Sequence, residues 1–369
     1  KRILLLVTMQ MLLLSLPLAC AAQSALLVGD LQGIVDSVAA KYDCAVSLGV
    51  TAGNTSISVA GGSASIGGGP ASTTDRYAWG SVTKTITGGA IMRLVADGKL
   101  SLDEPAYTYV DAMLKKSNYA YPTMQQLFAP DFWSIPPPVI FDPKNVTIRH
   151  LLAMLSGVPD YDTDGYRHLQ YNHPSAGFSP LDILDISHGP LMFVPGGPVP
   201  SSGPYHSATN YCSVNFMLLG FVLAHFAGAK TWDKYDQRDI LPDTLKERVF
   251  FADLDTLCGD ATAPVHGYDK QSFAAGDQPF DVSSLNCFAG WTAGNVIMDA
   301  QAAADWAMAL YGPDSVIPQA AIKQMLPGNA SYGLATFGFN GRYANGTAGE
   351  CYGHLGDTYG FTSTGSYFP

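Results

Sequence analysis

The sequence predicts a mixed α/β fold in which strands near both ends of the chain build one lobe and helices from the middle build a second, inserted lobe. Strand patterns lie before residue 61 and after residue 332, whereas most helical periodicities fall between them. With 369 residues, 47% of them apolar and only 14% charged, the chain can bury two cores. We expect an α/β lobe over about 23–105 and 290–369, and a helical lobe over about 106–289.

The first 22 residues have the three regions of a secretory signal peptide. Lys1 and Arg2 precede an apolar run from Ile3 to Leu18, and small residues follow at 19–22. We therefore expect cleavage after residue 21 or 22 and export of the protein. A retained signal anchor is the alternative, as is, more weakly, a lipoprotein site at Cys20.

The charge balance limits the possible partners. The formal net charge is -11 and no run of Lys or Arg occurs, which argues against nucleic acid or an anionic membrane. We expect a monomer that acts on a small molecule or a peptide, without a cofactor or a metal ion.

Two further patterns fit an oxidising secretory compartment. An odd number of cysteines follows the leader, without metal-site spacing, so one or two disulfides would leave at least one thiol: Cys44, Cys212, Cys258, Cys287 and Cys351. Four Asn-x-Ser/Thr sequons are candidate glycosylation sites: Asn54, Asn145, Asn329 and Asn345.

The N-terminal part is predicted to contain a helix, a hairpin and a second helix. Apolar spacing predicts a helix over 26–42, and two strands over 45–50 and 56–60 flank a Gly-Asn turn. A helix then starts at Ser81, and Gly98 lies where a left-handed cap would end it.

The rest of the chain mixes helices with long connections. Residues 105–142 are rich in aromatic residues and proline and predict a surface excursion, and 159–204 predict a long loop. Further helices are expected over 147–156, 215–228, 231–258 and 298–311, and strands over 332–339 and 351–363.

Ser81 and Lys84 form the first candidate for catalytic chemistry. Three positions apart on a helix, the two side chains share a face, so the Lys84 amine can approach the Ser81 hydroxyl. Partial burial and the positive end of the helix dipole would lower the pKa of Lys84 and make it a base. The alternative is that Ser81 is an ordinary helix N-cap.

Several ordered motifs resemble the serine β-lactamase and penicillin-binding-protein superfamily, in its branch of class C-type β-lactamases, D-alanyl-D-alanine carboxypeptidases and related esterases. The similarity covers about residues 26–369. It rests on Ser-Val-Thr-Lys at 81–84, Asp-Gly-Lys-Leu-Ser-Leu-Asp at 97–103, and the stretch from Thr147 to Tyr161 with Ser156-Gly157-Val158-Pro159-Asp160. The resemblance implies an antiparallel sheet flanked by helices, with Ser81 as nucleophile.

The second motif of this branch, Tyr-x-Asn, is matched by Tyr211-Cys212-Ser213, nine residues before Gly220. The resemblance implies that Tyr211 shares the proton relay with Lys84 and that Ser213 lies in the substrate site. Tyr211 could instead only pack its ring, and Tyr205 is a competitor with the wrong spacing.

The third motif, on an edge strand, is matched by Gly353-His354-Leu355-Gly356. The resemblance implies that His354 shapes the polar side of the pocket, that Gly356 lets the strand approach the acyl group, and that the N–H of Asp357 joins that of Ser81 in an oxyanion hole. His354 could otherwise be a polar residue of an exposed strand.

The expected function is that of a secreted serine hydrolase acting on an ester or amide, of esterase or D-amino-acid peptidase type. Ser213 in place of Asn, and Leu355 in place of a hydroxyl residue, weaken the case for penicillin-like substrates. The family fold continues beyond the His354 strand with further strand and helix, so the resemblance also implies a C-terminally truncated chain. A catalytically silent binding or scaffold protein is the alternative.

Overall fold

The computed structural model describes residues 21–129, 141–198, 210–270, 272, 279–288, 290–328, 330–339 and 350–369. The predicted signal peptide lies almost entirely outside these residues and stays a prediction. Among the helices described, none combines the length and the apolar character needed to cross a bilayer.

The N-terminal hairpin forms as predicted. Helix α1 (Ala21–Tyr42) precedes strands β1 (Val46–Ala52) and β2 (Thr55–Gly61), which pair antiparallel. Alternation along β2 turns Val59 toward α1, where it packs against Leu31 and Val35. The hairpin is thereby fixed to one face of α1.

Two three-stranded antiparallel sheets lie near the centre of the molecule. The first has the order β10-β9-β8 and the second the order β3-β7-β4, and their bounds are β3 Tyr77–Ala78, β4 Phe250–Phe251, β7 Val296–Met298, β8 Phe337–Gly338, β9 Tyr352–Thr358 and β10 Phe361–Tyr367. A short hairpin of β5 (Tyr268–Asp269) and β6 (Phe280–Asp281) completes the strands described. The expected antiparallel α/β class is confirmed.

Helix α2 (Thr83–Ala96) forms the centre of the main core. Ten of its fourteen residues are buried, because sheet residues contact one side and α8 (Val214–Phe226) the other. Gly98, with φ +69°, follows its C-terminus and ends the helix as predicted.

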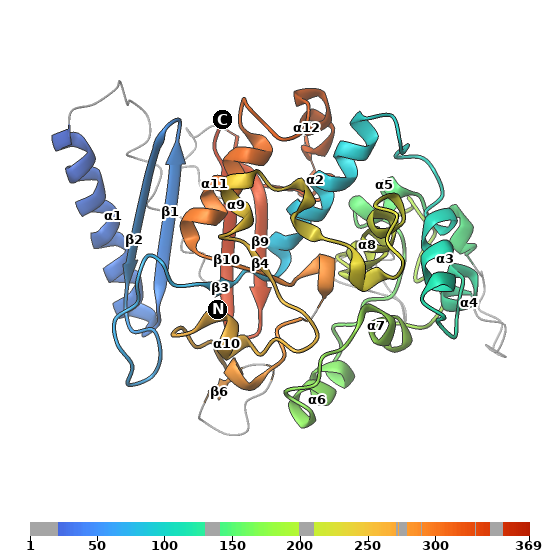
Figure 1. The fold of residues 1–369 in the computed structure, drawn as a ribbon, viewed down its shortest axis with the longest axis horizontal. Coiled ribbons are helices and arrows are strands. Elements are labelled where there is room, and N and C mark those ends of the chain that lie inside the picture. The colour runs from blue at the N-terminus through green and yellow to red at the C-terminus, as the bar shows by residue number, and fades with distance from the viewer. Residues whose placement is uncertain are drawn as a thin grey trace.

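Helices dominate the segment between the strands. Figure 1 shows them gathered beside α2, on the side away from α1 and the hairpin; their bounds are α3 Tyr107–Lys116, α4 Met124–Phe128, α5 Ile148–Leu152, α6 Asp164–Asn172 and α7 Pro180–Ile186. The mixed order of strands and helices thus agrees with an inserted helical part, whereas the lobe boundaries stay a prediction.

Four local expectations are wrong, the last of them in part. The surface excursion at 105–142 contains α3 and α4, and the long loop at 159–204 contains α6 and α7, whose N-caps are Thr163 and Ser179. The helix expected over 231–258 is instead a series of short turns with α9 (Asp243–Lys246) and the edge strand β4, before α10 (Cys258–Thr262) begins. Only β8 forms in the strand expected over 332–339.

Two helices in the C-terminal part of the chain pack against the elements described above. Helix α11 (Ala300–Tyr311), capped by Asp299, contacts both β1 and β10, and α12 (Gln319–Met325) contacts α2. Since α11 touches both the N-terminal hairpin and the β8–β10 sheet, it joins these two sets of strands (Figure 1).

Candidate active site

Ser81 lies in a short 3₁₀ turn, Gly80–Val82, between strand β3 and helix α2. The N-cap positions of this turn and of α2 are Trp79 and Val82, neither with a side-chain capping bond, so Ser81 is not the cap of a helix. Its side chain is half-buried. The Ser81 hydroxyl therefore lies just before helix α2 and does not accept a capping hydrogen bond from it.

Lys84 lies in the first turn of α2 and is fully buried. Its Nζ donates to Ser81 Oγ at 2.8 Å, to Ser213 Oγ at 3.2 Å and to the carbonyl oxygen of Ala293 at 2.9 Å. Three acceptors match the three protons of an ammonium group, which holds the amine in one position.

Burial lowers the pKa of Lys84 to about 7, although the negative charge of Asp160 opposes the shift. An ammonium taken out of water loses its hydration, and this loss exceeds the attraction of the carboxylate. A substantial fraction of the amine is thus neutral at physiological pH and able to take a proton from the hydroxyl 2.8 Å away.

Tyr211 and Ser213 enter the site from the segment just before α8. Tyr211 is half-buried, and Lys84 Nζ lies 5.0 Å from the centroid of its ring. Burial raises the pKa of the Tyr211 phenol, and the Ser81 side chain acts in the opposite direction. The hydroxyl reaches toward Ser81 without a hydrogen bond of standard geometry. The competitor Tyr205 lies outside the described residues.

His354 lies on β9 with none of its surface exposed, in contrast to the alternative of an exposed strand residue. Its Nδ1 is 2.6 Å from the carbonyl oxygen of Leu355, so this nitrogen must carry the proton and donate. Burial lowers the pKa of His354 to about 3, and Lys84 adds to the shift. Nε2 is consequently an acceptor, and the Tyr332 hydroxyl donates to it at 3.1 Å.

Gly356 brings β9 against the turn that carries Ser81. A Cβ at Gly356 would lie 2.0 Å from the Trp79 carbonyl oxygen, and one at Gly80 would lie 2.9 Å from the carbonyl oxygen of Asp357. The glycines thus allow two backbones to pass in direct contact. Strand β9 and the Ser81 turn form one wall of the site, with the Asp357 backbone on it.

Two residues of the site have no role in the sequence prediction. Asp160 lies in the stretch that carried the family resemblance, so a signal was present, and its Oδ1 accepts from the backbone N–H of Ser213 at 3.1 Å. Burial raises the pKa of Asp160 to about 6, while Lys84 lowers it. Tyr332 is 22 residues before His354 in an irregular segment, and no spacing rule connects them.

The remaining predicted residues are the sequon asparagines and the cysteines. Asn54, in the turn between β1 and β2, and Asn145 are exposed, whereas Asn329 and Asn345 lie outside the described residues. Cys258 and Cys287 form a disulfide, and Cys44, Cys212 and Cys351 are not in disulfides, which confirms the expected leftover thiols.

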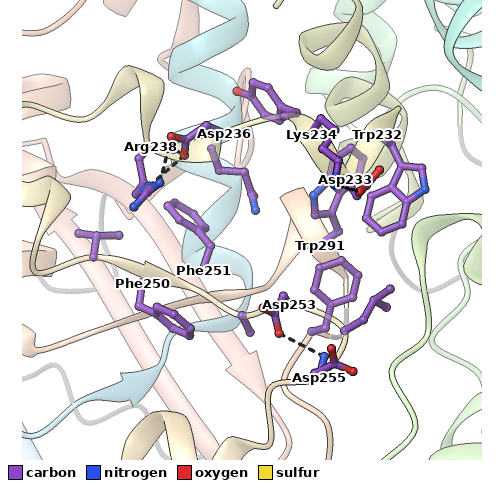
Figure 2. A pocket seen from close by; sticks show the side chains of 16 residues that line it. Trp232, Asp233, Lys234, Asp236, Arg238, Phe250, Phe251, Asp253, Asp255 and Trp291 are labelled. Atoms are coloured by element: carbon purple, nitrogen blue, oxygen red, sulfur yellow. Dashed lines mark hydrogen bonds and ion pairs between the residues drawn. The ribbon is translucent and has the colours of Figure 1, made fainter. Parts of the chain in front are cut away.

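A cavity of about 610 Å³ lies apart from the predicted site residues (Figure 2). Aromatic side chains and charged groups line it, with the ion pair of Asp236 and Arg238 on one side and Trp232 on the other (Figure 2). None of the predicted catalytic residues is among its lining. Within the part of the chain that the structure describes, no cluster of His, Cys, Asp or Glu has a metal-site arrangement.

Comparisons with known proteins identify the family and structures of similar fold. Residues 37–369 match the Beta-lactamase family. The fold is similar to a D-stereospecific amidohydrolase from a Streptomyces species (TM-score 0.63, 21% identity, 88% of this chain and 86% of that chain). It is also similar to D-amino acid amidase from Ochrobactrum anthropi SV3 in complex with L-phenylalanine amide, with a TM-score of 0.62, 20% identity, and 92% of this chain and 89% of that chain covered.

A third similar structure is the octameric penicillin-binding protein homologue from Pyrococcus abyssi, with a TM-score of 0.64, 20% identity, and 93% of this chain and 71% of that chain covered. The family match covers most of the sequence, far beyond the four residues of the Ser81 motif. The chain therefore belongs to the Beta-lactamase family, as a serine hydrolase of the β-lactamase-related type.

Proposed function

We propose that the chain is a secreted hydrolase of esters or amides that works through an acyl-enzyme on Ser81. The observation that carries the proposal is the contact of 2.8 Å between Lys84 Nζ and Ser81 Oγ, combined with the pKa of about 7 of that buried amine. A nucleophile beside a base that is partly neutral at physiological pH is the requirement for covalent catalysis by serine.

In the proposed reaction, neutral Lys84 takes the Ser81 proton while Oγ bonds to the carbonyl carbon. The backbone N–H groups of Ser81 and Asp357 stabilise the oxyanion. Collapse of the tetrahedral intermediate breaks the bond to the leaving group, which receives the proton from Lys84 through Tyr211. Water then attacks the acyl-enzyme by the same relay in reverse and frees Ser81.

The substrate class is proposed from the similar proteins and from the site. D-amino acid amidase and D-stereospecific amidohydrolase share the fold, and they suggest amides or esters of amino acids. Ser213 contributes a hydroxyl that accepts a hydrogen bond from Lys84, and it has no amide to offer to a β-lactam. We rank antibiotic hydrolysis below amide or ester hydrolysis.

Labelling with a fluorophosphonate tests the proposal, because the reagent requires an activated serine. The wild-type chain should be labelled at Ser81, whereas Ser81→Ala and Lys84→Met should not. Ser63→Ala, at an exposed serine outside the predicted site, serves as the control and should label normally. A wild-type chain that folds and does not react would support the silent binding protein instead.

Export and glycosylation are proposed from the leader and the sequons. Asn54 and Asn145 are exposed and therefore accessible to a glycosyltransferase. Expression of the full sequence in a secreting eukaryotic cell, followed by mass spectrometry of the medium, should find cleavage after residue 21 or 22 and glycans at these residues. Retention of the leader in a membrane fraction would favour the signal anchor.

A further inference from the structure

The carboxylate of Asp160 lies beside the reaction centre without an assigned role. Its Oδ1 accepts from the backbone N–H groups of Tyr161 at 2.9 Å and Ser213 at 3.1 Å. The Ser213 side chain in turn accepts from Lys84, which contacts Ser81. Only Ser213 thus lies between Asp160 and Lys84, the base of the proposed mechanism, and it is hydrogen-bonded to both.

Asp160 has no cationic partner in direct contact. Among the described residues, no Lys, Arg or His nitrogen lies within 4.0 Å of its carboxylate. Its neighbour along the chain, Asp162, pairs with Arg167, so the cation nearest in this loop is already engaged. Asp160 as a residue nevertheless keeps partial contact with solvent, and the two backbone N–H groups bond only to its Oδ1.

The facing strand offers no positive charge. His354 is neutral, since Nδ1 donates to Leu355 and Nε2 accepts from Tyr332. Leu355 has no hydroxyl for a carboxylate. A negatively charged substrate would meet the Asp160 charge, and among the described residues only buried Lys84 acts on Asp160 as a cation.

We propose that the site selects substrates with a free ammonium group next to the scissile carbonyl, as in α-amino amides and esters, and that Asp160 binds this ammonium. The inference rests on the proposed function and specifies its substrate class. It also links binding to chemistry: a second cation beside Asp160 favours the neutral form of Lys84, so the bound ammonium helps to create the base.

Matched substrates test the proposal. The p-nitroanilides of D- and L-phenylalanine would be compared with their N-acetyl derivatives, which keep the ring and scissile bond and lack the charge. Wild type should prefer the free amine of at least one enantiomer by about 30-fold in kcat/KM, the size expected for a desolvated charge pair.

The variant Asp160→Asn should lose about 30-fold on the free amine and less than about threefold on the N-acetyl substrate. The control Asp164→Asn removes an equal charge from the same loop, where the side chain is fully exposed, and should leave both rates unchanged. Fluorophosphonate labelling of each variant shows that it is folded and that Ser81 is reactive.

The possible failures are distinct. An equal loss of kcat/KM on both substrates would show that Asp160 acts only through Lys84 and does not bind the ammonium group, which would overturn the proposal. Wild type that is labelled and hydrolyses the N-acetyl substrates as fast as the free amines would also overturn it, with the proposed function intact. Absence of labelling in folded wild type would overturn the proposed function and this inference with it.

Discussion

The hydroxyl of Tyr332 donates to Nε2 of His354 at 3.1 Å, and this bond fixes the tautomer of a fully buried imidazole beside Lys84. A histidine held in this way presents no N–H and no charge to a substrate. The position to which the resemblance assigns the polar side of the pocket is therefore occupied by a neutral group.

The first prediction follows from this pair. His354 should stay neutral from pH 8 to pH 5, because burial lowers its pKa to about 3. ¹⁵N NMR of the imidazole should show a protonated Nδ1 and a bare Nε2 throughout, and a midpoint near 6.5 would contradict the structure.

The same pair affects stability against pH. The folded state binds fewer protons than the unfolded state between pH 3 and 6.5, so His354 lowers the free energy of unfolding progressively as the pH falls through this window. His354→Gln should reduce that dependence in urea unfolding measured from pH 7 to pH 4, whereas exposed His168→Gln should leave it unchanged.

The second prediction concerns the pH dependence of catalysis. Lys84 must be neutral to take the Ser81 proton, so kcat/KM should rise with pH to a plateau with an apparent pKa of about 7. Asp160 raises the pKa of Lys84, and Asp160→Asn should therefore shift this acidic limb to lower pH. If the acidic limb of the kcat/KM profile were unchanged in Asp160→Asn, Lys84 would not be the group whose titration sets that limb.

The third prediction uses the contact of β9 with the Ser81 turn. Gly356→Ala places a Cβ 2.0 Å from the Trp79 carbonyl oxygen and 2.1 Å from Ser363 Oγ, so the strand must move. We expect a loss of about 1–3 kcal/mol in the free energy of unfolding and slower labelling of Ser81.

Gly365 on the paired strand β10 provides the matched control. The atom nearest to a Cβ added at Gly365 is Val82 Cγ1, a side-chain methyl at 3.3 Å, and not a backbone atom. Gly365→Ala should cost less than Gly356→Ala in urea unfolding. If both variants lost the same free energy of unfolding, the loss would come from the strand preference of alanine in the hairpin and not from the contact with Trp79.

The fourth prediction concerns the disulfide of Cys258 and Cys287, which are 29 residues apart. Replacing both by alanine should lower the free energy of unfolding by about 3 kcal/mol, since the unfolded chain gains freedom. Labelling of Ser81 should persist, because the bridge is outside the site. Cys44→Ala, at an exposed thiol, is the control. No difference between the two variants would contradict a structural role.

Local signals predicted much of the fold. The helix that begins beside Ser81 and ends at Gly98 has an apolar period and a left-handed glycine, and both properties reside in the segment itself. The segment 231–258 has no such consistency, since Asp236 initiates a short turn and Pro242 interrupts the period. There the tertiary contacts, including the pairing of β4 with β7, decide the conformation.

The candidate site divides in the same way. Ser81 and Lys84 lie three positions apart in one local segment, the 3₁₀ turn and the first turn of α2, so the sequence suffices to place them together. Asp160 and Tyr332 reach the site from distant segments and act through hydrogen bonds to Ser213 and His354. Such pairs depend on how whole elements pack, which no local pattern encodes.

The position of Ser81 and Lys84 on one continuous backbone has a mechanical consequence. Their separation is set by the short stretch that runs from the 3₁₀ turn of Ser81 into the first turn of α2, whereas Tyr211 and Ser213 belong to the segment that leads into α8. A small displacement of α8 against α2 would change the alignment of the proton relay and leave the nucleophile and its base in register. The proposed machinery thus consists of one part fixed within a local segment and one part whose position depends on helix packing, and we expect substitutions in the α2–α8 packing to change the rate of turnover without any change at Ser81.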